Sequence, residues 1–84
     1  MIQIVELMAE DEFADLGGLK ASFAREISES LAGFGYAAEA VDRSDWYSFE
    51  RKILVDTNAP AGMVERVLSE QNRKLKKAKG VLVP

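Results

Sequence analysis

The chain has 84 residues, 48% of them hydrophobic and 30% charged, which predicts one globular domain over residues 1–84. It has no cysteine and no histidine, which excludes disulfides, thiolate metal sites and histidine acid–base chemistry. The net charge of −3 conceals a gradient: residues 1–50 hold eleven acidic and three basic residues, whereas residues 51–84 hold eight basic and three acidic ones.

The first half of the chain predicts a strand followed by an amphipathic helix. Residues 2–7 are β-branched and partly alternating, which is typical of a strand with one face buried. An acidic stretch at 9–15 precedes a helical pattern, in which Lys20 is among the polar residues between the apolar ones. The apolar stripe consists of Leu19, Phe23, Ile27, Leu31 and Phe34. Gly33 and Gly35 predict the end of this helix.

The middle of the chain predicts a hairpin. Residues 36–41 form its first strand, 42–45 have the composition of a turn, and 48–56 form the clearest strand of the sequence. Residues 57–60 then predict the start of a second helix, because Pro60 suits its first turn and Thr57 or Asn58 can cap its free N–H groups.

The second helix is predicted from a stripe that runs from Val64 to Leu75, with basic residues in its last turns and Gly80 as a cap. Residues 81–83 add a short edge strand. The order strand, helix, strand, strand, helix, strand is the α+β, ferredoxin-like βαββαβ arrangement. It predicts a four-stranded antiparallel sheet in the order 4-1-3-2 with two helices on one face. The other face is then open to solvent or covered by a partner.

Two glycine motifs invite a ligand-binding interpretation. Residues 33–38 match the dinucleotide pattern G-x-G-x-x-A, but here a helix ends and a strand begins, so we interpret the motif as a helix stop. Residues 15–19 open the first helix and resemble the ligand loop of ACT regulatory domains, which share this order of elements. That resemblance covers one loop and implies a small-ligand sensor. The segment from this loop to Gly35 is about one helical turn longer than the resemblance would lead us to expect. The alternative is a turn that glycine permits.

Two oppositely charged clusters are candidate binding sites. The acidic one has three interpretations: a cation site without EF-hand spacing, a solvated loop, or a competitor for the basic groove of a nucleic-acid enzyme. It comprises Glu10, Asp11, Glu12 and Asp15. The basic one also has three interpretations: a solvated helix end, a site for an acidic protein, or a phosphate-binding site. It comprises Arg73, Lys74, Lys76, Lys77 and Lys79. Nucleic acid is disfavoured because the central strands offer only Phe49 for base stacking.

The predicted hairpin tip is the third candidate. It carries Arg43, Asp45, Trp46 and Tyr47, and aromatic and arginine side chains are typical of interface hot spots. The alternative is that the aromatic rings pack back onto the core.

Together these features predict a non-catalytic protein-binding module that needs no cofactor or metal: a regulator or inhibitor. Such a protein suits a phage or mobile element, in the manner of an anti-CRISPR protein that acts on a host nucleic-acid-processing complex. Homodimer formation through the sheet is a further expectation. No apolar run reaches the roughly 18 residues of a membrane helix and no signal peptide is evident, so we expect a cytoplasmic protein without membrane contact. The alternatives are a nucleic-acid-binding protein that uses the basic cluster and an ACT-like sensor.

Overall fold

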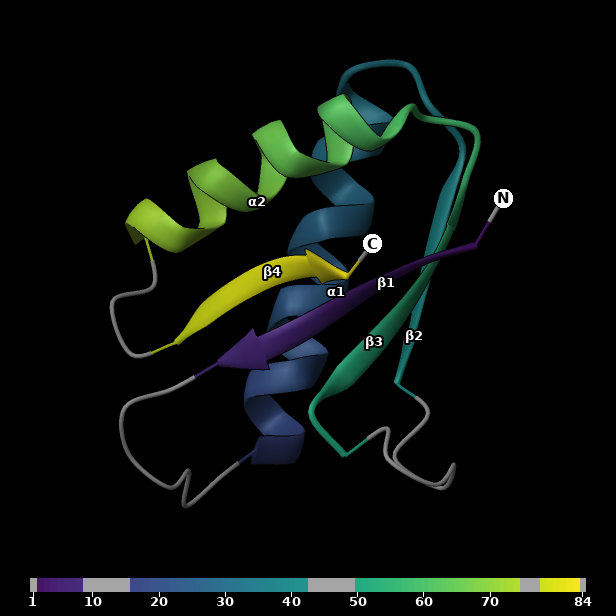
Figure 1. Ribbon diagram of the computed structural model, residues 1–84. Coiled ribbons are helices and arrows are strands. Elements are labelled where there is room, and N and C mark those ends of the chain that lie inside the picture. Colours follow the sequence, from purple (N-terminus) through teal and green to yellow (C-terminus); the bar gives the residue numbers. More distant parts are fainter. Residues whose placement is uncertain (1, 9–15, 43–49, 75–77, 84) are drawn as a thin grey trace.

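A computed structural model describes residues 2–8, 16–42, 50–74 and 78–83 of the protein (Figure 1). The elements follow the order β1 (Ile2–Met8), α1 (Leu16–Gly33), β2 (Ala38–Asp42), β3 (Lys52–Thr57), α2 (Ala61–Lys74) and β4 (Lys79–Val83). The strands form one antiparallel sheet in the order β2-β3-β1-β4. The predicted ferredoxin-like α+β fold and its strand order are therefore confirmed.

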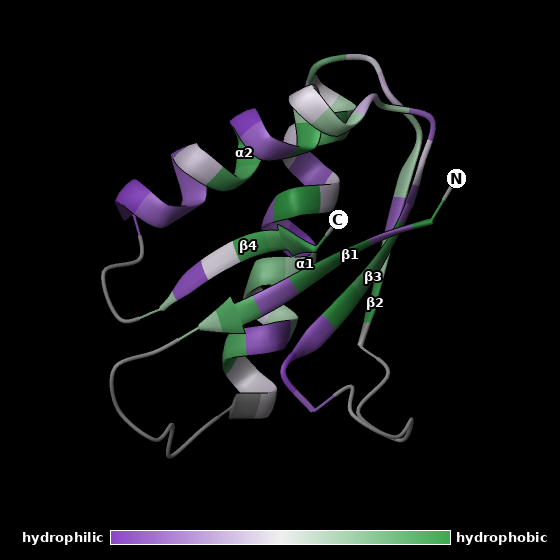
Figure 2. Cartoon of the chain, viewed as in Figure 1, coloured by the Kyte–Doolittle hydropathy of each residue, from purple (hydrophilic) through white to green (hydrophobic). Residues whose placement is uncertain are grey.

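One hydrophobic core fills the space between the sheet and the two helices. Alternate residues of the central strands point into it, and helix residues three or four apart meet them from α1 and α2. Figure 2 shows the corresponding hydrophobic stretches along the strands and the alternation of hydrophilic and hydrophobic residues in α2. Full burial of one such side chain stabilises the fold by about 1.5–3 kcal/mol. The largest contributors are Val5, Leu7, Phe23, Ile27, Leu31, Ile53, Val55, Val64, Val67 and Leu68.

Helix α1 ends where the glycine pattern predicts. Gly35 has a φ of 91°, a conformation that L side chains rarely adopt. The N–H of Tyr36 donates to the carbonyl of Leu31 at 3.0 Å, and the N–H of Gly35 donates to the carbonyl of Ala32 at 3.0 Å. These two bonds form a Schellman motif. The interpretation of residues 33–38 as a helix stop, and not as a dinucleotide loop, is therefore confirmed.

The segment before α2 uses its polar side chains differently from the prediction. The hydroxyl of Thr57 donates to the carbonyl of Ala37 at 2.7 Å and accepts from the N–H of Ala59 at 3.0 Å. The Oδ1 of Asn58 accepts from the N–H of Ala37 at 3.0 Å. The two side chains thus bind the start of the hairpin and their own loop, and none of these three bonds goes to an N–H of α2. They hold the backbone of Ala37, and β2 begins at the next residue, later than predicted.

Other boundaries also differ from the prediction. Residues 50 and 51 lie in a turn, so β3 begins at Lys52, although the carbonyl of Arg51 still accepts from the N–H of Leu7 at 2.7 Å. Strand β4 begins at Lys79, which places Gly80 inside the strand instead of at a helix cap. Gly80 pairs with Leu7 of β1 in the sheet, and a Cβ added to it would lie 3.1 Å from the Cδ2 of Leu68 on α2.

Two residues of the predicted first helix were assigned to the wrong environment. Phe34 lies beyond the last helical residue and is 49% exposed, with the guanidinium carbon of Arg66 5.2 Å from its ring centroid. Lys20 is fully buried because it continues the stripe of Phe23 and Ile27 one turn toward the N-terminus. A buried ammonium group requires polar or charged partners, and Lys20 does take part in an interaction within the protein.

Candidate functional site

The face of the sheet that points away from the helices carries a continuous apolar row. Val5 and Leu7 of β1 point into the core, so the residues between and beside them point to the opposite face. The strand register extends that face to all four strands: Val41 lies opposite Leu54, Leu54 opposite Ile4, and Ile4 opposite Val83. We call these four residues the open-face row.

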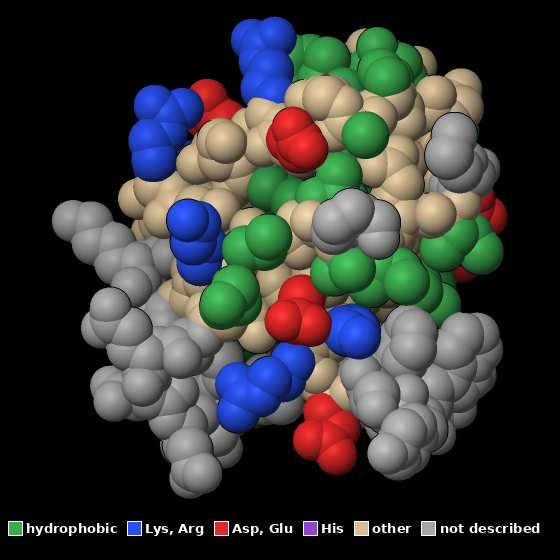
Figure 3. Space-filling view, viewed as in Figure 1, with side chains coloured by type: hydrophobic (Ala, Val, Ile, Leu, Met, Phe, Trp, Pro, Cys, Tyr) green, Lys and Arg blue, Asp and Glu red, His purple; other side chains and the backbone are tan. Residues whose placement is uncertain are grey.

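Exposed apolar side chains flank this row. Ile2 is 61% exposed, Met8 is 53% exposed and Val81 is 37% exposed. Val41, which belongs to the row itself, is also 37% exposed. These four are all but one of the exposed large hydrophobic residues in the described part of the chain, and they lie on one face. Figure 3, viewed from the same side as Figure 1, shows hydrophobic side chains grouped among Lys, Arg, Asp and Glu side chains. Exposed apolar residues that gather on one face, rather than being scattered, are typical of an interaction site.

The two ends of the open face carry opposite charge. On one side of the row, Glu39 and Asp56 lie directly opposite each other on β2 and β3; we call this the acidic end. On the other side lie Lys52 and Lys79 with Glu6, and we call this the basic end. The Nζ of Lys52 is 3.9 Å from the Oε2 of Glu6, a partly exposed pair that contributes little stability. The open face is therefore acidic at one end of its strands and carries two lysines at the other end.

Helix side chains occupy part of both sheet edges. At β4, the carboxamide of Asn72 donates to the carbonyl of Gly80 at 3.0 Å and accepts from its N–H at 2.8 Å, as a neighbouring strand would. At β2, the N–H of Ala40 donates to the hydroxyl of Ser28 at 3.2 Å. These bonds block edge-to-edge pairing at these positions. The face of the sheet is consequently a more accessible docking surface than its edges.

Most of the residues predicted to form binding sites lie outside the described part of the chain. This holds for the whole acidic cluster, the whole hairpin tip and part of the basic cluster: Glu10, Asp11, Glu12, Asp15, Arg43, Asp45, Trp46, Tyr47, Lys76 and Lys77. Their roles stay predictions. The described cations Arg73 and Lys74 lie in the last turn of α2, as predicted.

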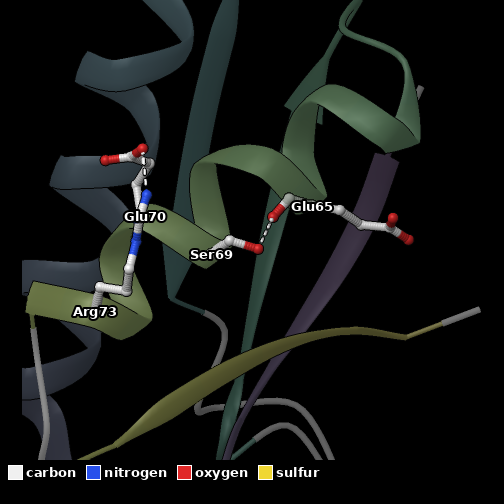
Figure 4. A network of polar contacts seen from close by, with 4 residues as sticks. All are labelled: Glu65, Ser69, Glu70 and Arg73. Atoms are coloured by element: carbon white, nitrogen blue, oxygen red, sulfur yellow. Dashed lines mark hydrogen bonds and ion pairs between the residues drawn. The ribbon is translucent and has the colours of Figure 1, made fainter.

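Lys79 departs from the prediction, because it lies in β4 and not in the last turns of the helix. It therefore belongs to the open face, at the basic end. Arg73 has a local partner: its guanidinium group donates to the Oε1 of Glu70 at 2.6 Å, as Figure 4 shows on the outer side of α2. In the same view the hydroxyl of Ser69 donates to the carbonyl of Glu65 at 3.0 Å. The described cations are thus divided between a helix end and a sheet face.

The small-ligand role of residues 15–19 stays a prediction, and the structure places residues 16–19 in the first turn of α1, so they open the helix as expected. Helix α1 begins at Leu16, so Gly17 and Gly18 belong to its first turn and form no separate loop. A Cβ atom built on Gly17 would meet no atom within 4 Å, so close packing does not require glycine at that position.

Sequence reasoning missed Asn72, which closes one edge of the sheet, and the burial of Lys20. Asn72 follows the buried Gln71 on α2 and carries no motif, since its role depends on a strand eight residues away. For Lys20 a signal did exist: its spacing from Phe23, Ala24 and Ile27 continues the buried stripe.

Among the described residues, no group of three or more Asp or Glu side chains is placed to hold a metal ion. In the same residues, no helix combines the length and the apolar character that a bilayer span requires. Comparison of the chain with protein-family models, curated proteins and solved structures gave no significant match.

Proposed function

We propose that this protein is a non-catalytic binding module, a regulator or inhibitor, whose open sheet face docks onto another protein. The observation that carries the proposal is the open-face row, which crosses all four strands with exposed apolar residues on either side. Because burial of apolar surface is the main driving force of protein association, this face gains the most from a partner. The expected partner presents an apolar surface flanked by charged groups.

The surroundings of the row favour a protein over a nucleic acid. The described strands contain no aromatic residue on which a base could stack, and single-stranded nucleic acid is bound mainly by such stacking. The open face also combines an acidic end with a basic end, and a phosphate backbone would be repelled by the carboxylates of Glu39 and Asp56. A protein surface can match both ends, which fixes the orientation of the partner.

The test is affinity capture with the tagged protein and three variants, with bound proteins identified by mass spectrometry. Leu54→Asp changes the centre of the open-face row, and Val41→Lys changes its exposed end on an edge strand, where loss of folding is less of a concern. Ser69→Lys is the matched control for Val41→Lys, because it adds the same positive charge to the outer side of α2. Circular dichroism and thermal melting establish that each variant is folded.

We expect a protein that is captured by the wild type and by Ser69→Lys but is lost with the two open-face variants. Equal capture by all folded variants would overturn the proposal. The same experiment with labelled RNA and DNA in place of lysate covers the nucleic-acid alternative. A salt-dependent shift of the labelled strand by the wild type would contradict a protein-only function.

A further inference from the structure

We propose that the occupant of the open face is a second copy of this chain, packed sheet to sheet about a two-fold axis that crosses the strands along the open-face row. This inference rests on the proposed role of the open face as a protein-docking surface, and it names a second copy as the occupant in place of a different protein. It follows from the symmetry of the apolar and charged groups around Leu54. In a symmetric dimer the same surface must be complementary to itself.

The charges of β3 are arranged with that symmetry. Asp56 lies two residues from Leu54 on one side and Lys52 lies two residues from it on the other, and all three point to the open face. Rotation by 180° about an axis through Leu54 and perpendicular to β3 reverses the strand direction. It therefore places Asp56 of each copy over Lys52 of the other, and Leu54 over Leu54. The two outer charges form two intermolecular pairs around an apolar centre.

On the neighbouring strand β1 the same operation places Ile2 of each copy over Glu6 of the other, and Ile4 over Ile4. The contact between Asp56 and Lys52 is therefore the charge match between the described residues of the two faces. A two-fold axis parallel to the strands and between β3 and β1 would instead place Lys52 over Glu6 but Asp56 over the apolar Ile2. The perpendicular axis is thus the one that gives both charges of β3 an opposite charge in the other copy. Stacked sheets pack about 10 Å apart with strands rotated by about 30°, which requires the axis to tilt by about 15° from the perpendicular.

The sheet edges and the area of the face are consistent with this geometry. Dimers that extend the sheet need free backbone groups at an edge, and Asn72 and Ser28 occupy such groups on β4 and β2. Four strands about 4.8 Å apart, each with about five residues of 3.3 Å rise, give a footprint of about 300 Å². This is below the roughly 800 Å² per partner of a stable complex, so the described face predicts a reversible dimer.

The first measurement is the molar mass of the wild-type protein by sedimentation equilibrium between about 1 µM and 1 mM, the range in which weak complexes dissociate. We expect the mean mass to rise from monomer toward dimer with concentration. Leu54→Asp should remain a monomer, and Ser69→Asp, on the outer side of α2, should behave as the wild type. A wild-type monomer at 1 mM would overturn the inference, as would a dimer that persists in folded Leu54→Asp.

Charge reversal at Lys52 and Asp56 tests the axis and does not depend on Leu54. Lys52→Glu should weaken self-association at least about tenfold, because two carboxylates then face each other twice in the dimer. Asp56→Lys should do the same with ammonium groups. An equimolar mixture of the two variants should form a heterodimer again, because one of its two pairs is the original one and the other is its reverse. A mixture that stays monomeric would refute the proposed axis.

The two proposals fail in different ways. If the wild type is monomeric at 1 mM but captures a protein that Val41→Lys does not capture, the open face serves another protein and the dimer is wrong. If neither self-association nor capture responds to changes of the open-face row, both proposals fail.

Discussion

Gly80 offers the sharpest test of how tightly α2 packs on the sheet. Its Cβ, if present, would lie 3.1 Å from Cδ2 of Leu68, 3.2 Å from Cε1 of Phe23 and 3.3 Å from Cγ1 of Val5. Ordinary contacts of this kind begin near 3.5 Å. The three atoms belong to side chains of α2, α1 and β1, so Gly80→Ala requires side chains of all three elements to shift by a few tenths of an ångström.

The expected loss follows from two opposing contributions. Insertion of a methyl group into a well-packed core lowers the free energy of unfolding by about 1–3 kcal/mol. Replacement of glycine by alanine restricts the unfolded chain and returns about 0.4–1 kcal/mol. The middle of these two ranges gives an expected loss of about 1.3 kcal/mol in the free energy of unfolding for Gly80→Ala, and of about 5–10 °C in the melting temperature of a domain of this size.

The assay is urea unfolding followed by far-UV circular dichroism, with Gly62→Ala as the matched control. Gly62 lies in the first turn of α2, where an added Cβ would meet no atom within 4 Å. We expect this control to raise the free energy of unfolding by up to about 1 kcal/mol through helix propensity. If Gly80→Ala is as stable as the wild type while Gly62→Ala behaves as expected, the packing argument for Gly80 is wrong.

Three further predictions follow from the same structure, each measured by urea unfolding. Gly35→Ala should destabilise the protein by about 1–2 kcal/mol because φ is 91° at that position, whereas Gly33→Ala should not; equal effects would contradict the role of the Schellman motif. Thr57→Val should cost about 1–3 kcal/mol because it leaves the buried N–H of Ala59 without its acceptor, and a stability change within 0.5 kcal/mol would argue against that bond. Asn72→Ala should cost about 1–2 kcal/mol through the loss of two bonds to Gly80, whereas Ser69→Ala should have almost no effect; equal losses would refute the edge-capping role.

The sequence by itself determined the order of the elements and the fold class. The apolar spacing of Phe23, Ile27 and Leu31 and the alternation around Val5 and Leu7 are local patterns whose period specifies a helix or a strand. The helix stop at Gly35 was predictable for the same reason, because a positive φ is a local requirement. Six such elements in this order leave few alternative topologies.

The tertiary structure decided which residues share a surface. No local pattern shows that Val41, Leu54, Ile4 and Val83 form one row, because they come from four strands that pair at long range. For the same reason the sequence did not show that Lys79 lies on the sheet face or that Asn72 closes an edge. Strand register is set by the whole core at once, and it is the register that turns scattered apolar and charged residues into a candidate docking face.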